Sequence, residues 1–140
     1  MKRFLNCVCF LLVAVTLFTT TAFAAEPRAS HYFAASSAYI DKVSNTKYNI
    51  WFDVTAVGIM SKIGVKTIKV QRSTDEVNWT TVKTYSMSDY SQMTDTNTAG
   101  HSGYVTYSGS ANYYYRAYVT FYAKNSSGSA TDSYYTNIVP

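Results

Sequence analysis

Charged residues are scarce in this chain. Only 14% of its 140 residues are Asp, Glu, Lys or Arg, against about 25% in an average soluble protein, which argues against a solvated, disordered chain. Twelve basic and eight acidic residues give a formal charge of +4. A charge this small does not predict binding to nucleic acid or to an anionic membrane. The length suits one domain with a single core.

Cysteine is confined to Cys7 and Cys9, within a segment that we interpret as a secretory signal peptide. This segment, 1–24, has a basic start, an apolar run over 4–18 and small residues at its end. The apolar run is shorter than the roughly 20 residues that span a bilayer, so we expect cleavage and no stable membrane anchor. The remaining chain would carry a charge of 10 − 8 = +2, without thiols, disulfides or Cys-ligated metals. Because small secreted animal domains are often disulfide-linked, we expect a secreted bacterial protein.

Helical periodicity is also missing, because no part of the remaining chain keeps apolar residues at i, i+3, i+4 and i+7. Alternation of period two occurs instead. In the strand expected at 48–57, the even-numbered residues from Ile50 to Ala56 share one face, and Trp51 lies on the other. Fourteen tyrosines support this interpretation, since tyrosine suits a pleated, half-buried surface. Further strands are expected at 37–42, 67–73, 80–85, 104–107, 113–123 and 133–139. About seven short strands predict an all-β fold, a single antiparallel β-sandwich over 37–140, after a flexible segment at 25–36.

The stretch 86–103 has no periodicity and many turn-forming residues, so we interpret it as a long loop. Asp89, Tyr90 and His101 within it are the candidate residues for a small secreted enzyme or toxin. The chain has no metal-ligand spacing such as H-x-x-x-H, and no recognisable pairing of a nucleophile with a base. Polar loop residues usually serve turns. We therefore predict no catalytic residues, no metal and no cofactor.

Two parts of the chain resemble fibronectin type III-like modules. Residues 68–75, followed by Trp79 and 80–82, resemble the third strand, tight turn and fourth strand of such modules. Residues 113–117 with 124–129 look like their last hairpin. The resemblance implies an immunoglobulin-like sandwich in which Tyr113 buries its ring and bonds its hydroxyl to the backbone. Trp79 is expected to seal one end of the core, because tryptophan is highly buried on average.

Most of the chain after the leader is similar to a family of small secreted Firmicutes proteins of unknown function. The similarity is carried by residues 51–55, 88–90, 101–107 and 115–119. It implies secretion from a Gram-positive bacterium and supplies no activity.

The strand expected at 113–123 turns a set of tyrosines and one arginine outward. If the strand at 67–73 lies beside it, as in the resembled modules, a lysine and a glutamine flank this set. We call the whole set the Tyr/Arg face; it comprises Tyr114, Arg116, Tyr118, Tyr122, Lys69 and Gln71. One of Tyr134 and Tyr135 would join from the other side, and Trp51 is a second candidate on the opposite sheet.

Aromatic rings beside cationic and amide donors suit both sugar rings and protein partners. The chain is therefore predicted to be a secreted, non-catalytic binding or adhesion module for an unknown glycan or extracellular protein. The alternative is that cross-strand tyrosine pairs only stabilise an exposed sheet. A self-associating surface protein, pairing by edge strands or by the tyrosine face, also remains open.

Overall fold

The computed structural model describes residues 31–140, so the signal peptide expected at 1–24 lies outside the described residues. The elements in chain order are β1 (Phe33–Lys42), β2 (Lys47–Met60), β3 (Lys62–Ser73), β4 (Thr80–Ser86), the short 3-10 helix η1 (Ser91–Met93), β5 (Thr94–Asp95), β6 (Thr98–Ser108), β7 (Tyr114–Asn125) and β8 (Gly128–Tyr135). In this part of the chain, no helix is long and apolar enough to cross a membrane.

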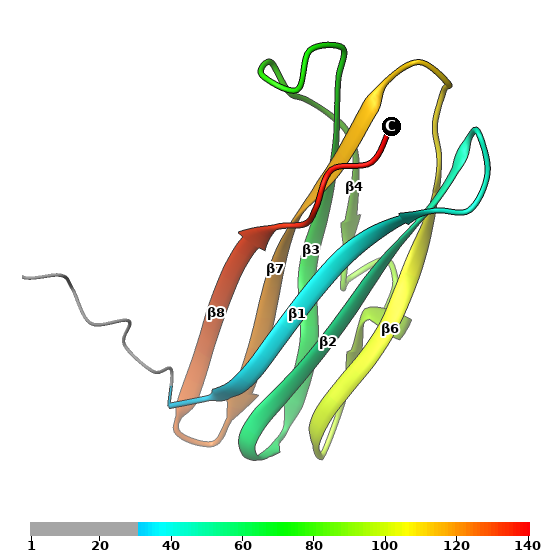
Figure 1. Cartoon of the computed structure of the whole chain (residues 1–140). Coiled ribbons are helices and arrows are strands. Elements are labelled where there is room, and N and C mark those ends of the chain that lie inside the picture. Colours follow the sequence, from blue (N-terminus) through cyan, green and yellow to red (C-terminus); the bar gives the residue numbers. More distant parts are fainter. Residues whose placement is uncertain (1–30) are drawn as a thin grey trace, which may run out of the picture.

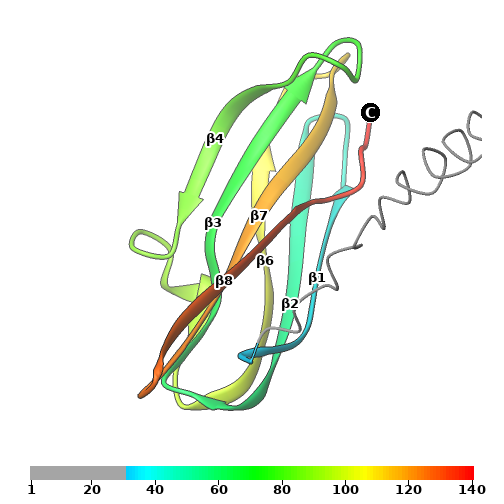
Figure 2. The same ribbon diagram turned by 90° about the vertical axis from the view of Figure 1, so that its left-hand side faces the viewer.

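The strands form two packed antiparallel sheets (Figure 1). One sheet has three strands in the order β1-β2-β6. The other has five, with β4-β3-β7-β8 in order and the short β5 paired with β3. Figure 2 shows β3, β4, β7 and β8 as one layer with β1, β2 and β6 behind and beside it. The predicted all-β, antiparallel β-sandwich is therefore confirmed.

Every second side chain of β2 and of β7 points into the space between the sheets and fills it. The even-numbered residues from Ile50 to Ala56 in β2 are buried, as predicted. In β7 the odd-numbered residues from Tyr115 to Ala123 are fully buried, while their even-numbered neighbours remain partly exposed. Since a strand has a side-chain period of two, burying one set fixes the other set on the outer face.

The expected boundaries of the first and last strands were wrong. β1 begins at Phe33 rather than at residue 37, so the last four residues of the flexible segment expected at 25–36 are in a strand. The last strand runs over Gly128–Tyr135 rather than over 133–139, and Val139 forms only an isolated bridge with Tyr115.

The largest difference concerns 86–103, which is not one long loop. Residues from Thr98 onward belong to β6 and pair with β2, and residues 91–95 form η1 and β5. The side chain of Met93 is fully buried and anchors this segment in the core.

At the start of β7, the tyrosine that buries its ring and bonds its hydroxyl to the backbone is Tyr115, not Tyr113. The Tyr115 hydroxyl donates to the Ser110 carbonyl oxygen (3.0 Å) and accepts from the Ser110 N–H (2.8 Å). Tyr113 precedes β7 and is only partly buried, with the Arg72 guanidinium carbon 4.6 Å from its ring centroid. Tyr113 and Tyr115 are two residues apart, so alternation along a strand would put both rings on the same side. Because β7 begins at Tyr114, only Tyr115 lies within the strand, and its ring enters the core.

The stability of the fold is expected to fall at alkaline pH. Tyr85 is buried and donates its hydroxyl to the Thr106 carbonyl oxygen (2.8 Å). Burial raises the pKa of Tyr85 from its ordinary value of 10.0 to about 12, and burial also raises the pKa of Tyr48 and of Tyr107. The pKa of Tyr85 is higher in the folded protein than in the unfolded chain, so its ionisation favours unfolding. The contribution of Tyr85 to the free energy of unfolding is therefore fully present below pH 10 and is lost as pH rises through about 12.

Urea unfolding over a series of alkaline pH values measures this loss, and ultraviolet titration of the tyrosines measures ionisation in the folded state. The Tyr85→Phe variant should keep more of its stability in the same pH range than the wild type does. If Tyr85 ionised together with the exposed tyrosines in the native protein, the explanation by burial would be wrong.

Candidate functional site

The structure brings most of the predicted Tyr/Arg face together on the outside of the five-stranded sheet. Lys69 of β3 lies opposite Tyr118 of β7, and Gln71 lies opposite Arg116. On the other side of β7, Tyr135 of β8 pairs with Tyr118, and the two ring centroids are 4.8 Å apart.

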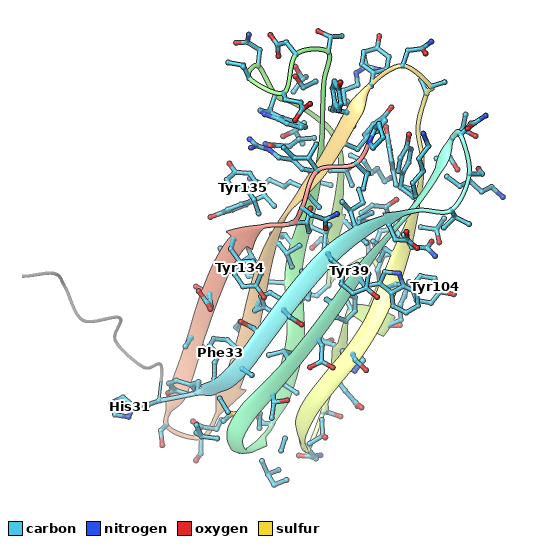
Figure 3. The ribbon with its side chains drawn as sticks, in the orientation of Figure 1. His31, Phe33, Tyr39, Tyr104, Tyr134 and Tyr135 are labelled. Atoms are coloured by element: carbon cyan, nitrogen blue, oxygen red, sulfur yellow. The ribbon has the colours of Figure 1, made fainter. Side chains whose placement is uncertain are left out.

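Of the two tyrosines at the end of β8, Tyr135 joins this face and Tyr134 does not. Tyr134 packs inward, where its ring stacks on Phe121 at 5.4 Å. Figure 3 shows the Tyr135 side chain extending away from the body of the domain, with Tyr134 turned toward β1.

Arg116 is held between two aromatic rings at the centre of the face. Its guanidinium carbon lies 4.2 Å from the ring centroid of Trp79 and 4.0 Å from that of Tyr135. Its Nε donates to Gln71 Oε1 at 2.9 Å. Both rings lie within cation–π distance of the guanidinium, and within residues 31–140 its only hydrogen bond is the one from Nε to Gln71. The Nη edge is therefore available for a planar anion such as a carboxylate.

Trp79 was expected in the core and instead belongs to the outer face. It is partly exposed, and its Nε1 donates to the Glu76 carbonyl oxygen (3.0 Å). The preceding turn is held by the Asp75 carboxylate, which accepts hydrogen bonds from Ser73 Oγ and from the N–H groups of Val77 and Asn78. Hydrogen bonds from the Asn78 N–H, the Asn78 side-chain amide, Ser73 Oγ and the Val77 N–H hold the pKa of Asp75 well below its usual range. A turn fixed in this way, and not strand alternation, directs Trp79 over Arg116.

Tyr114 and Tyr122 lie at opposite ends of the face. Tyr114 is opposite Ser73, and Tyr122 is opposite Gly64. Neither ring contacts another aromatic ring within residues 31–140, in contrast to Tyr118 and Tyr135. The central cluster consists of Trp79, Arg116, Tyr135, Tyr118, Lys69 and Gln71.

Trp51 occupies a second aromatic cluster, on the outer face of the three-stranded sheet. The strand register puts Tyr39 of β1 and Tyr104 of β6 on either side of Trp51. The Trp51 ring centroid lies 6.2 Å from that of Tyr39, with an interplanar angle of 14°, and 4.5 Å from that of Tyr104. Tyr39 and Tyr104 are additions to the predicted set, although outward alternation in their strands was the signal that could have found them. Figure 3 labels both tyrosines over β1, β2 and β6.

The candidate catalytic residues of 86–103 are not assembled into one constellation. Asp89 is exposed and accepts from Ser88 Oγ (3.2 Å). His101 lies in β6, where its Nε2 is 2.8 Å from the Gln92 carbonyl oxygen. Tyr90 packs edge-on against Tyr85 and lines the same hollow of about 660 Å³ as His101, whereas Asp89 does not line it. Across residues 31–140, no three His, Cys, Asp or Glu side chains are placed to hold a metal ion.

Comparison of the chain with protein-family models, with curated proteins and with solved structures finds no match. The case for a function therefore depends on the geometry of the two outer faces.

Proposed function

We propose that this chain is a secreted, non-catalytic binding module that contacts a carboxylate-bearing glycan or protein through the Tyr/Arg face. The observation that carries the proposal is the position of Arg116, whose guanidinium lies over the rings of Trp79 and Tyr135 and whose Nε is bonded to Gln71. The basic start, apolar run and small residues of 1–24 support secretion.

The strands that carry the face are basic, and the nearest acidic residues in the chain are Asp75 and Glu76, in the turn before Trp79. Strands β3, β4 and β7 contain no Asp or Glu, and the one acidic residue of β8 is Asp132. The Asp132 carboxylate accepts from Ser36 Oγ of β1 (3.3 Å), on the side of the other sheet. No carboxylate within residues 31–140 forms an ion pair with Arg116 or Lys69. An acidic ligand would supply the missing counter-charge.

The arrangement also reduces the entropy lost on binding. Trp, Tyr and Arg are the residue types that dominate binding energies at interfaces. An arginine that is already stacked and hydrogen-bonded loses little rotamer freedom when a ligand arrives. The Tyr/Arg face thus combines a positioned cation with aromatic area around it.

Replacing Arg116 should remove most of the binding to polyanions. Isothermal titration with polygalacturonate and with polyglutamate separates an acidic glycan from an acidic polypeptide. We expect Arg116→Met to weaken the preferred ligand about tenfold or more, because a charge-assisted bidentate contact is lost. Arg116→Lys should restore only part of the affinity, since an ammonium lacks the planar pair of donors.

Lys47→Met is the matched control, because it removes one positive charge from an exposed site on the three-stranded sheet. Equal weakening by Lys47→Met and Arg116→Met would mean nonspecific attraction by net charge. The proposal would also fail if the folded protein bound neither polymer at low salt, where exposed charges are screened least.

A further inference from the structure

The outer face of the three-stranded sheet includes three adjacent rows of side chains running across the strands. The middle row, here called the aromatic row, is Tyr39, Trp51 and Tyr104, one residue from each strand. Tyr39 is 52% exposed and Tyr104 is 48% exposed. Within residues 31–140, no other part of the domain covers this aromatic surface.

Polar rows border the aromatic row on both sides. One consists of Ser37, Asp53 and Ser102, and the other of Asp41, Asn49 and Thr106. Outward neighbours along a strand are about 7 Å apart, so each polar row is within reach of a ligand lying on the rings. Thr106 Oγ1 donates to Asn49 Oδ1 (2.8 Å), which fixes the orientation of the amide.

The three rows carry a charge opposite to that of the Tyr/Arg face, and Lys47 lies one outward position beyond Asn49 on β2, outside these rows. The three rows contain two carboxylates, one on each side of the aromatic row, and no Lys or Arg. Within the described residues, neither Asp41 nor Asp53 forms an ion pair. Beside the aromatic row is a hollow of about 460 Å³ that includes Ser37, Asp53 and Ser102 in its lining.

We propose that this face binds an oligosaccharide of amino sugars that carry free, protonated amines. The apolar C–H faces of the sugar rings would stack on Trp51 and its two tyrosine neighbours, which offer broad aromatic surfaces. The ammonium groups would interact with the ring faces and with the Asp41 and Asp53 carboxylates. Serine, threonine and asparagine side chains in the polar rows would bond the sugar hydroxyls.

The charges of the polar rows favour this ligand over other glycans. An acidic polysaccharide would be repelled by two uncompensated carboxylates. A neutral sugar would leave both carboxylates without a counter-charge. The site lies on the opposite sheet from Arg116, so it is independent of the proposed function of the Tyr/Arg face.

The test compares glucosamine oligomers with the same oligomers after N-acetylation, at a mildly acidic pH where the free amines are protonated. Isothermal titration should detect the amine form, with the acetylated form about tenfold weaker or more. Trp51→Ala should reduce the affinity for the amine form by a similar factor. Combining Asp41→Asn with Asp53→Asn should remove the preference for the amine form while leaving weak stacking of both sugars.

Tyr135→Ala is the matched control, since it removes an exposed aromatic ring from the other sheet. It should leave glucosamine binding unchanged and weaken polyanion binding, so that failure of this site is distinguishable from failure of the Tyr/Arg face. Because Trp51 is only partly buried, we expect Trp51→Ala to fold, and Tyr104→Ser on the edge strand β6 is a second variant if it does not.

Any of the following results would overturn the proposal. The first is equal affinity for the amine and acetylated oligomers. The second is wild-type affinity in the Trp51→Ala variant, or no binding to the folded wild-type protein. The third is a dimer, detected by sedimentation, that the Trp51→Ala substitution dissociates and that does not bind the sugar. A second copy of the chain would then cover this face.

Discussion

Replacing Gly64 with alanine should destabilise the domain by about 3 kcal/mol or more. Gly64 has φ +147°, a backbone conformation that side chains rarely adopt. A Cβ at this position would overlap the carbonyl oxygen of Met93 and lie 2.7 Å from the Cα of Thr94. Both obstacles are backbone atoms, so rotation of a side chain cannot relieve the overlap. Either β3 or the segment 91–95 must move.

Gly58→Ala is the control for this prediction. Gly58 lies in β2, where an added Cβ would have no atom within 4 Å, and its φ is not positive. Alanine there should change the free energy of unfolding by about 0.5 kcal/mol or less. Urea denaturation of both variants measures the difference. A cost below about 1 kcal/mol for Gly64→Ala would mean that β5 and the buried Met93 detach from β3 without loss.

The sequence was sufficient to predict strands whose inner face is continuously apolar. In β7 every second residue from Tyr115 to Ala123 is buried, and this is the pattern from which the strand was predicted. In β6 only Val105 is buried, and Gly100 and Gly103 interrupt the alternation. The N-terminal half of β6 is a strand because β2 offers it a partner, which no local pattern in 98–103 could reveal.

For the candidate surfaces, the sequence likewise predicted the side chains whose direction follows from alternation along a strand. Alternation along the strand predicted that Arg116 and Tyr118 point outward. The register of β3 against β7 then places Gln71 beside Arg116. Strand alternation could not predict the direction of Trp79, because Trp79 precedes β4 and its direction depends on the turn that Asp75 holds. Trp51 was predicted as a candidate, but Tyr39 and Tyr104 of the aromatic row were missed for a related reason. Each of its residues alternates outward, but only the register of three strands shows that Tyr39, Trp51 and Tyr104 are neighbours.

The second large effect is expected at Tyr115, whose ring and hydroxyl both contribute to stability. Its side chain is fully buried, and its ring centroid is 4.5 Å from that of Tyr48 and 5.6 Å from that of Tyr107. Tyr115→Ala should lower the free energy of unfolding by about 4 kcal/mol, the usual result of emptying an aromatic site in a core. Gly109 would not relieve the cavity, since it has no side chain and packs directly against the Tyr115 ring.

Conservative variants separate the hydroxyl from the ring. Tyr115→Phe leaves the Ser110 N–H and carbonyl oxygen without the hydroxyl that bridges them, so we expect a loss of about 1–3 kcal/mol. Tyr48 is the matched control, because it is equally buried in the same cluster and its hydroxyl has no hydrogen-bond partner within residues 31–140. Removing that hydroxyl relieves an unmet desolvation cost, so Tyr48→Phe should be neutral or stabilising.

Urea denaturation of the three variants at neutral pH measures these differences. Similar losses for Tyr48→Phe and Tyr115→Phe would show that ring packing alone explains the cluster and that the bonds to Ser110 add nothing. A loss for Tyr115→Phe with no loss for Tyr48→Phe would instead show that the bonds from the Tyr115 hydroxyl to Ser110 stabilise the connection between β6 and β7.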